Sequence, residues 1–253
     1  SNSVLIKIFN HIERICIEKA ELVIVICSHL ESTVKRIDPN ANVYLIENTP
    51  LATEDTEEQL TAADLQKRYD LDDRPTIVYT GTFEDYQGID IVVKSAATVN
   101  KQIDTFRYIL VGGESEQVNN MRQLAQKEGV DNVIEFTGRR PIEEMPAFRE
   151  LADILISPRV SGTNTPLKIY SYLKSGTPIV ATDVYSHTQV LSSEVAELTE
   201  PEPSAFGEGI VRLLTNNDQG RNLAENAMHL AEEEYSQDVF ESKHRSAYES
   251  IDI

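Results

Sequence analysis

Short apolar runs alternate with amphipathic segments through most of this 253-residue chain. Runs rich in β-branched residues predict buried strands, and segments with an apolar residue every three or four positions predict helices. The strands are expected at TIVYT, FRYILVG, NVIEFTG, DILIS, PIVAT and, more weakly, VAEL, and the helices between them at 89–100, 116–128, 143–151, 166–174 and 205–215. Such alternation is typical of a parallel sheet covered on both faces. The pattern therefore predicts an α/β fold with a doubly wound, six-stranded parallel sheet.

The first fifty residues form a separate and smaller pattern. A helix is expected from Val4 to Lys19, a strand at ELVIVICS, a helix from Ser28 to about residue 37 and a strand at NVYLIEN. Two strands alone do not make a stable sheet. We therefore expect residues 3–48 to be a strand–helix–strand remnant of a second domain, most of which lies outside this chain.

The remaining boundaries follow from composition. The segment TPLATEDTEEQLT is acidic, polar and free of aromatic residues, so residues 49–64 are expected to be a linker. The main domain is expected at residues 65–235 and ends in a helix at about 219–230. A last helix, within residues 236–253, is expected to pack on the remnant.

Charge and cysteine content narrow the class of protein. The formal net charge of −19 disfavours a nucleic-acid partner. Cys16 and Cys27 lie in or beside apolar runs, which favours buried thiols and a reducing, cytoplasmic location. The longest apolar run, near residues 22–27, is too short to span a bilayer.

The residues that follow each predicted strand carry the candidate chemistry, because ligands of open α/β sheets bind beyond the carboxyl ends of the strands. Glycines, hydroxyl groups and arginines gather there: Gly81-Thr82, Gly112-Gly113-Glu114, Gly138-Arg139-Arg140, Pro158-Arg159 and Thr182-Asp183. This acidic chain is therefore expected to have a locally basic rim.

The segment SGTNTPLKIYSYLK places a lysine on that rim. Asn164 or Thr165 is expected to cap a helix that starts at Pro166, with Lys168 in its first turn. A cation there costs roughly 0.3–1 kcal/mol unless an anion is bound. The pattern favours a phosphate site, and a lysine that points into solvent is the alternative.

Several other activities lack their motifs. The sequence has no GxGxxG after the first strand, no GxxxxGK[ST] and no GxSxG, which disfavours dinucleotide binding, P-loop hydrolysis and a nucleophile elbow. The histidines lack metal-ligand spacing, and no metal site is expected. His187 alone falls near the rim, either as a site residue or as a neighbour of a helix cap.

The segments IVYTGTFEDYQGIDIVVKSA, YILVGGESE, VIEFTGRRPIEEMPAFRELADILISPR and GTNTPLKIYSYLKSGTPIVATD resemble the C-terminal half of GT-B-fold retaining glycosyltransferases of group 1, family 4. The resemblance covers residues 76–235. It implies that this domain binds a nucleotide-sugar donor, such as a UDP- or GDP-sugar, and that an N-terminal domain recognises the acceptor. The chain alone is then not expected to turn over.

The resemblance also implies roles for residues of the rim. Gly81 matches the phosphate loop, Gly138 and Arg139 match the strand end that reads the base, and Gly112 lies beside them. Arg159 and Lys168 are expected to stabilise the leaving diphosphate without a cofactor. The loop that meets the donor comprises Gly162, Thr163, Asn164, Thr165, Pro166 and Leu167.

Four positions depart from the family pattern. Thr82 and Gln87 stand where many relatives have an arginine and a lysine, and Thr163 and Ser171 stand where many have glutamates.

Three functions stay open. The first is transfer of a hexose, with retention, to an unidentified glycan or lipid-linked acceptor. The second is a degenerate nucleotide-binding module without catalysis, and the third a GT-B-fold sugar-nucleotide epimerase.

Overall fold

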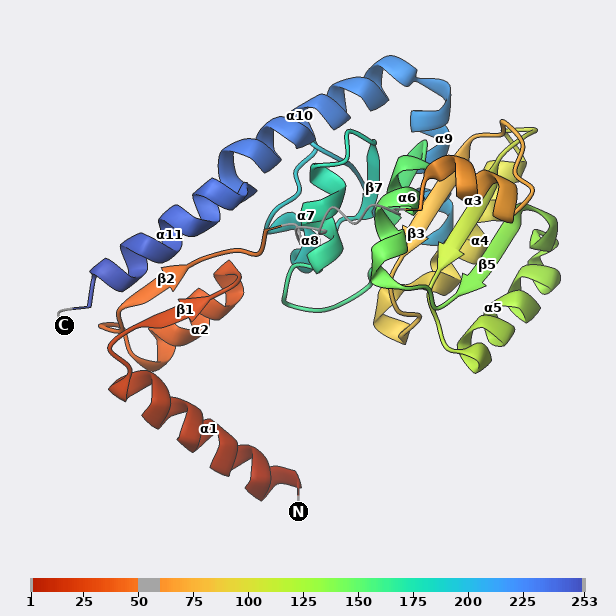
Figure 1. Cartoon of the computed structure of the whole chain (residues 1–253). Helices are drawn as coiled ribbons and strands as arrows, with labels where there is room; N and C mark the ends of the chain where they lie inside the picture. The colour runs from red at the N-terminus through yellow and green to blue at the C-terminus, as the bar shows by residue number, and fades with distance from the viewer. Residues whose placement is uncertain (1, 50–59, 252–253) are drawn as a thin grey trace. The chain divides into compact units, whose positions relative to one another are not determined.

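The computed structural model describes residues 2–49 and 60–251. The chain divides into two compact units (Figure 1). The smaller unit comprises Ser1–Thr49 and Glu233–Ile253, and the larger unit comprises Pro50–Glu232.

The larger unit is built on one parallel sheet of six strands in the order β5-β4-β3-β6-β7-β8. The strands are β3 (Thr76–Thr80), β4 (Arg107–Val111), β5 (Ile134–Gly138), β6 (Ile154–Ser157), β7 (Ile179–Thr182) and β8 (Glu197–Thr199). The predicted six-stranded parallel sheet is therefore confirmed. The chain winds outward from β3 and then outward again from β6, so the topological switch point lies between these two central strands.

Helices cover the sheet because its strands are apolar on both faces. Ile77 and Tyr79 share one core with Val92 and Val93 of α4 and with Phe206 of α9. The helices of this unit are α3 (Ala62–Arg68), α4 (Ile89–Asn100), α5 (Ser115–Glu128), α6 (Met145–Glu150), α7 (Leu167–Leu173), α8 (Tyr185–Thr188), α9 (Pro203–Thr215) and the start of α10 (Asn217–Tyr235), with 3-10 turns η1 (Asp85–Gln87), η2 (Asp131–Val133) and η3 (Ile142–Glu144).

The largest differences from the predicted helix bounds are at residues 143–151 and at the end of α10. The helix expected at 143–151 is a 3-10 turn, η3, followed by the short α6. Pro146 explains the break, since its ring lacks an N–H and fits only the first turn of α6. Helix α10 runs on to Tyr235, five residues past the expected end at residue 230.

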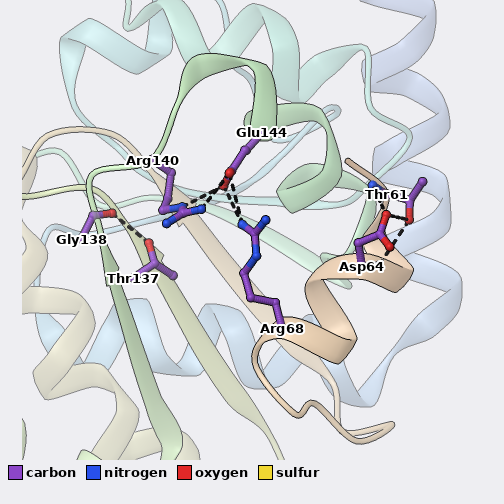
Figure 2. A network of polar contacts seen from close by, with 7 residues as sticks. All are labelled: Thr61, Asp64, Arg68, Thr137, Gly138, Arg140 and Glu144. Atoms are coloured by element: carbon purple, nitrogen blue, oxygen red, sulfur yellow. Dashed lines mark hydrogen bonds and ion pairs between the residues drawn. The ribbon is translucent and has the colours of Figure 1, made fainter. Parts of the chain in front are cut away.

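A carboxylate joins α3 to the loop after β5 (Figure 2). Glu144 accepts hydrogen bonds from Arg68 at 3.1 Å and from Arg140 at 2.7 and 2.8 Å. The bond from Arg140 is the main cause that lowers the pKa of Glu144.

Helix α3 starts at Ala62, and Thr61 is its N-cap, so the last three residues of the predicted linker are helical. Residues 50–59 of that linker lie outside the described residues.

The smaller unit holds α1 (Asn2–Lys19), β1 (Val23–Val25), α2 (Ser28–Ile37), β2 (Val43–Leu45) and α11 (Gln237–Glu249). Its two strands are parallel and shorter than predicted, with three residues each. An ion pair at 2.9 Å between Lys243 of α11 and Glu47 helps to close the unit.

Helix α1 leaves much of its apolar surface exposed. Leu5, Phe9 and Ile12 are each at least half exposed. Cys27 is buried as predicted, but Cys16 on α1 is exposed, so the prediction for this thiol was wrong. None of the helices in the described residues is both long and apolar enough to cross a membrane, and the cytoplasmic location stays a prediction.

Candidate functional site

Lys168 lies against the end of strand β3. Its Nζ is 3.8 Å from the centroid of the Tyr79 ring and donates a hydrogen bond of 3.2 Å to the carbonyl oxygen of Thr80. Gly81 has a φ of 151°, and a Cβ at this position would lie 2.7 Å from the Tyr79 hydroxyl and 3.3 Å from the lysine Nζ. A glycine is therefore required for the ammonium group and the backbone of this loop to come so close.

The charge of Lys168 is only weakly compensated. The side chain is half-buried, and within the described part of the chain no carboxylate pairs with it. Burial lowers its pKa well below the ordinary value, and the positive charge of Arg159 lowers that pKa further. A partly desolvated ammonium group without a counter-charge is an environment that favours a bound anion. The alternative that Lys168 points into solvent is wrong.

Arg159 shapes the loop that follows β6. Its Nε donates to the carbonyl oxygen of Ser161 at 2.7 Å and its Nη1 to that of Asn164 at 3.1 Å. The guanidinium group also lies 5.0 Å from the centre of the Tyr86 ring. A Cβ on Gly162 would come within 2.4 Å of Nη2, so this glycine lets the loop fold tightly over the arginine.

The loops after β3 and β6 contact each other at the switch point of the sheet. The backbone N–H of Val160 donates to the carbonyl oxygen of Tyr86 at 2.9 Å. Gly88, with a φ of 68°, packs so closely that a Cβ would lie 2.2 Å from the carbonyl oxygen of Pro158. This contact places the loop of Gly81 and the loop of Arg159 at the position where open α/β sheets bind ligands.

The start of α7 differs from the prediction. The helix begins at Leu167, and Pro166 is its N-cap with extended backbone angles and no side-chain cap. Neither Asn164 nor Thr165 caps it, because Pro166 itself has a φ of −63° and a ψ of 132°, so both residues lie before the N-cap position. The Thr165 hydroxyl is buried and has no partner among the described residues.

The ends of β4 and β5 form a neighbouring part of the same edge. The Gly112 N–H donates to the carbonyl oxygen of Gly138 at 2.9 Å. Arg139 Nη1 lies 2.5 Å from a carboxylate oxygen of Glu114, and both side chains are exposed. This ion pair offsets the positive charge that the sequence analysis assigned to Arg139, which is a correction to the predicted basic rim.

The other predicted residues are less tightly engaged. The Thr82 carbonyl accepts from the Tyr79 hydroxyl at 2.7 Å, and the Thr163 carbonyl accepts from the Gln189 amide at 2.8 Å. Gln87 lies in η1, and its buried Oε1 has no partner within the described residues. Leu167 is exposed at the start of α7, and Ser171 is half-buried on the same helix.

His187 is fully buried beneath this edge. Its Nε2 lies 2.9 Å from the hydroxyl of Ser157, and its Nδ1 lies 2.9 Å from the carbonyl oxygen of Thr182. Burial lowers its pKa to about 4, so the ring is neutral near pH 7. The same Nδ1 lies 3.2 Å from the Thr182 hydroxyl, which donates to the carbonyl oxygen of Arg159. His187 therefore supports the loop of Arg159 through Thr182.

Sequence reasoning missed Tyr79 and Tyr86, the aromatic partners of Lys168 and Arg159. Both tyrosines lie close to Gly81 in the sequence, in or after a predicted strand, but aromatic residues are common there and give no distinct signal. Within the described ranges, no group of three or more His, Cys, Asp or Glu residues could hold a metal ion.

The comparison with known proteins identifies the family. The family profile described as Glycosyl transferases group 1 matches residues 62–230. The chain therefore belongs to the group 1 glycosyl transferases, and its larger unit has the fold of a GT-B domain.

Individual relatives are distant. A GDP-mannose-dependent alpha-(1-6)-phosphatidylinositol monomannoside mannosyltransferase of Mycobacterium tuberculosis is 33% identical over 96 residues, which is 38% of this chain and 25% of that protein. An alpha-D-kanosaminyltransferase of Streptomyces kanamyceticus is 22% identical and matches 72% of this chain and 47% of that protein. The chain spans less than half the length of these curated relatives.

A solved structure supports the fold. The structure of Anabaena HepE in complex with UDP and glucose superposes with a TM-score of 0.77 at 15% identity, covering 93% of this chain and 64% of that one.

Proposed function

We propose that the larger unit binds the diphosphate group of a nucleotide-sugar donor where β3 and β6 end. In the whole enzyme, a hexose would pass from this donor to a glycan or lipid-linked acceptor with retention of configuration. The observation that carries the proposal is Lys168, whose partly desolvated ammonium group has no carboxylate partner in the described residues and lies against Gly81.

The proposed chemistry follows from the charge that develops during transfer. When the glycosidic bond to the diphosphate breaks, negative charge builds up on the leaving group. Fixed positive charges aimed at that point stabilise the transition state more than the ground state. Lys168 and Arg159 would supply this field, because the two loops that carry them are joined at the switch point. The proposal assigns this role to the two side chains and to no resident cofactor.

Relatives support a nucleotide donor without agreeing on its base. The mycobacterial mannosyltransferase is named as GDP-mannose-dependent, whereas Anabaena HepE was solved with UDP. Both donors share the nucleoside diphosphate that the proposed site would bind.

The proposal is tested by calorimetric titration of this chain with GDP, UDP and ADP. We expect at least one diphosphate to bind and Lys168→Met to weaken that binding by about 10- to 100-fold, since a charge-assisted hydrogen bond contributes roughly 1.5–3 kcal/mol. Lys174→Met is the matched control, because Lys174 is exposed at the other end of α7. Equal effects of the two variants, or no binding by the wild type, would contradict the proposal.

The second candidate is a nucleotide-binding module without catalysis. It is favoured by Thr163 and Ser171, whose hydroxyl groups cannot replace the charge of the glutamates that the family resemblance leads us to expect at these positions. Release of sugar or diphosphate by the whole enzyme, measured with radiolabelled donor, would separate the two candidates: binding without any turnover favours the module.

A further inference from the structure

An ion pair connects the ends of the two strands beside β3. Arg139 follows β5 and Glu114 follows the end of β4, and their charged groups meet at 2.5 Å. Each residue comes directly after a glycine with left-handed backbone, since Gly113 has a φ of 81° and Gly138 a φ of 68°. These turns project both side chains beyond the carboxyl edge of the sheet.

The backbone below the pair is fixed, but the charged groups themselves are accessible. The Glu114 N–H donates to the Gln117 side chain at 2.9 Å. The neighbouring Arg140 is held by two bonds to Glu144, which anchors the loop that carries Arg139 (Figure 2). The side chains of Arg139 and Glu114 are 73% and 64% exposed, and such a pair contributes little to stability.

The pair lies at a suitable position for the base of a nucleotide. β4 and β5 are the first and second neighbours of β3, roughly 5 and 10 Å away. A ribose can bridge that distance from a diphosphate bound at Lys168. This inference therefore depends on the proposed function and concerns the same donor.

We propose that Glu114 and Arg139 select a guanine base, so that the donor is a GDP-sugar. Guanine presents two adjacent donors, N1–H and N2–H2, and two acceptors, O6 and N7. The Glu114 carboxylate accepts from the two donors, and the Arg139 guanidinium donates to the acceptors, which is the pairing that arginine makes most often with guanine.

The same pair disfavours the other bases. Uracil presents its single N3–H between two carbonyl oxygens, so a carboxylate that faces this N–H also faces an acceptor. Adenine presents the acceptor N1 where guanine has a donor. Selectivity in this site therefore comes from repulsion of the wrong base as well as from attraction of the right one.

The test is calorimetry of the full chain with GDP, IDP and UDP. IDP is the sharpest probe, because its base differs from guanine only by the missing 2-amino group. We expect GDP to bind at least 10-fold more tightly than IDP or UDP, and Glu114→Gln to reduce both ratios to about 3-fold or less. Ratios are used because the lost negative charge strengthens every diphosphate equally. Glu116→Gln, an exposed acid in the first turn of α5, is the control and should keep the wild-type ratios.

The comparison of nucleotides separates failure of guanine selection from failure of diphosphate binding. If UDP binds as tightly as GDP while Lys168→Met still weakens both, the diphosphate site stands and guanine selection is overturned. GDP selectivity that persists in Glu114→Gln also overturns the role of Glu114. If no diphosphate binds the wild type, both proposals fail together.

Discussion

His187 shows how one buried residue links stability to pH. Its pKa is about 4 in the folded chain and 6.5 in the unfolded chain, so the unfolded chain binds more protons between these values. The stability that the neutral ring provides is present above pH 6.5 and is lost as the pH falls. Between pH 7.5 and pH 5 we expect a loss of about 2 kcal/mol in the free energy of unfolding from this residue.

The measurement compares denaturant unfolding of the wild type and His187→Gln at both pH values. The stability difference between the two proteins should shrink by about 2 kcal/mol at pH 5, because glutamine does not titrate. The exposed His229→Gln serves as the control and should follow the wild type. A stability difference that does not change with pH would show that His187 is not held neutral by its burial.

At this scale, the sequence predicted which residues lie at the carboxyl edge of the sheet better than which partners they have there. Gly81 and Arg159 follow the ends of predicted strands and Lys168 lies in the first turn of a predicted helix, so their positions could be read from the pattern. Side-chain partners depend on residues distant in sequence, such as Thr80, which lies 88 positions before Lys168. For the same reason, the pairing of Arg139 with Glu114 could not be read from either segment.

The loops after β3 and β6 depend on a glycine at their contact. Gly88→Ala combines an unfavourable left-handed backbone with a Cβ at 2.2 Å from the Pro158 carbonyl oxygen. Gly129 has nearly the same φ, 70° against 68°, but a Cβ added there would meet no atom within 4 Å. The two substitutions therefore share the backbone cost and differ only in the steric clash.

We expect Gly129→Ala to cost about 1 kcal/mol of stability and Gly88→Ala at least about 3 kcal/mol. Thermal melting measures this, since each kcal/mol shifts the Tm by roughly 2–4 °C in a domain of this size. Gly88→Ala should also weaken diphosphate binding, and Gly129→Ala should not. Similar melting temperatures for the two variants would mean that the loops separate without cost.

The elements of the larger unit were predictable because most of its strands, namely β3, β4, β6 and β7, are largely apolar runs that are buried on both faces. Where tertiary contacts decide the bounds, the prediction failed. The strand expected at ELVIVICS is reduced to Val23–Val25 because it has a single partner of equal length, β2. The helix expected from Pro166 starts one residue later because Pro166 has an extended backbone and is the N-cap instead of the first helical residue.

The two units differ in how much core each contains. The larger unit has six strands and a core of aromatic and aliphatic side chains on its sheet. The smaller unit has two strands of three residues and a core centred on Val25, Val34 and Ala41. Because stability grows with the apolar area removed from water, the smaller unit should open at a lower free energy than the larger one.

Hydrogen–deuterium exchange of the full chain, with and without a nucleoside diphosphate, tests this difference together with the location of the site. Amides of β1 and β2 should exchange faster than those of β3 and β4. A diphosphate at 100 times its Kd should raise the opening free energy of the larger unit by about 2.7 kcal/mol, which slows exchange about 100-fold in its most protected strands. Exchange in β1 and β2 should not change, because the ligand binds a unit that they do not belong to. Slower exchange in both units would contradict this, since it would mean that the smaller unit contributes to the bound state. The Lys168→Met variant supplies the control: because its binding is 10- to 100-fold weaker, the diphosphate at the same concentration should slow exchange only about 2- to 11-fold.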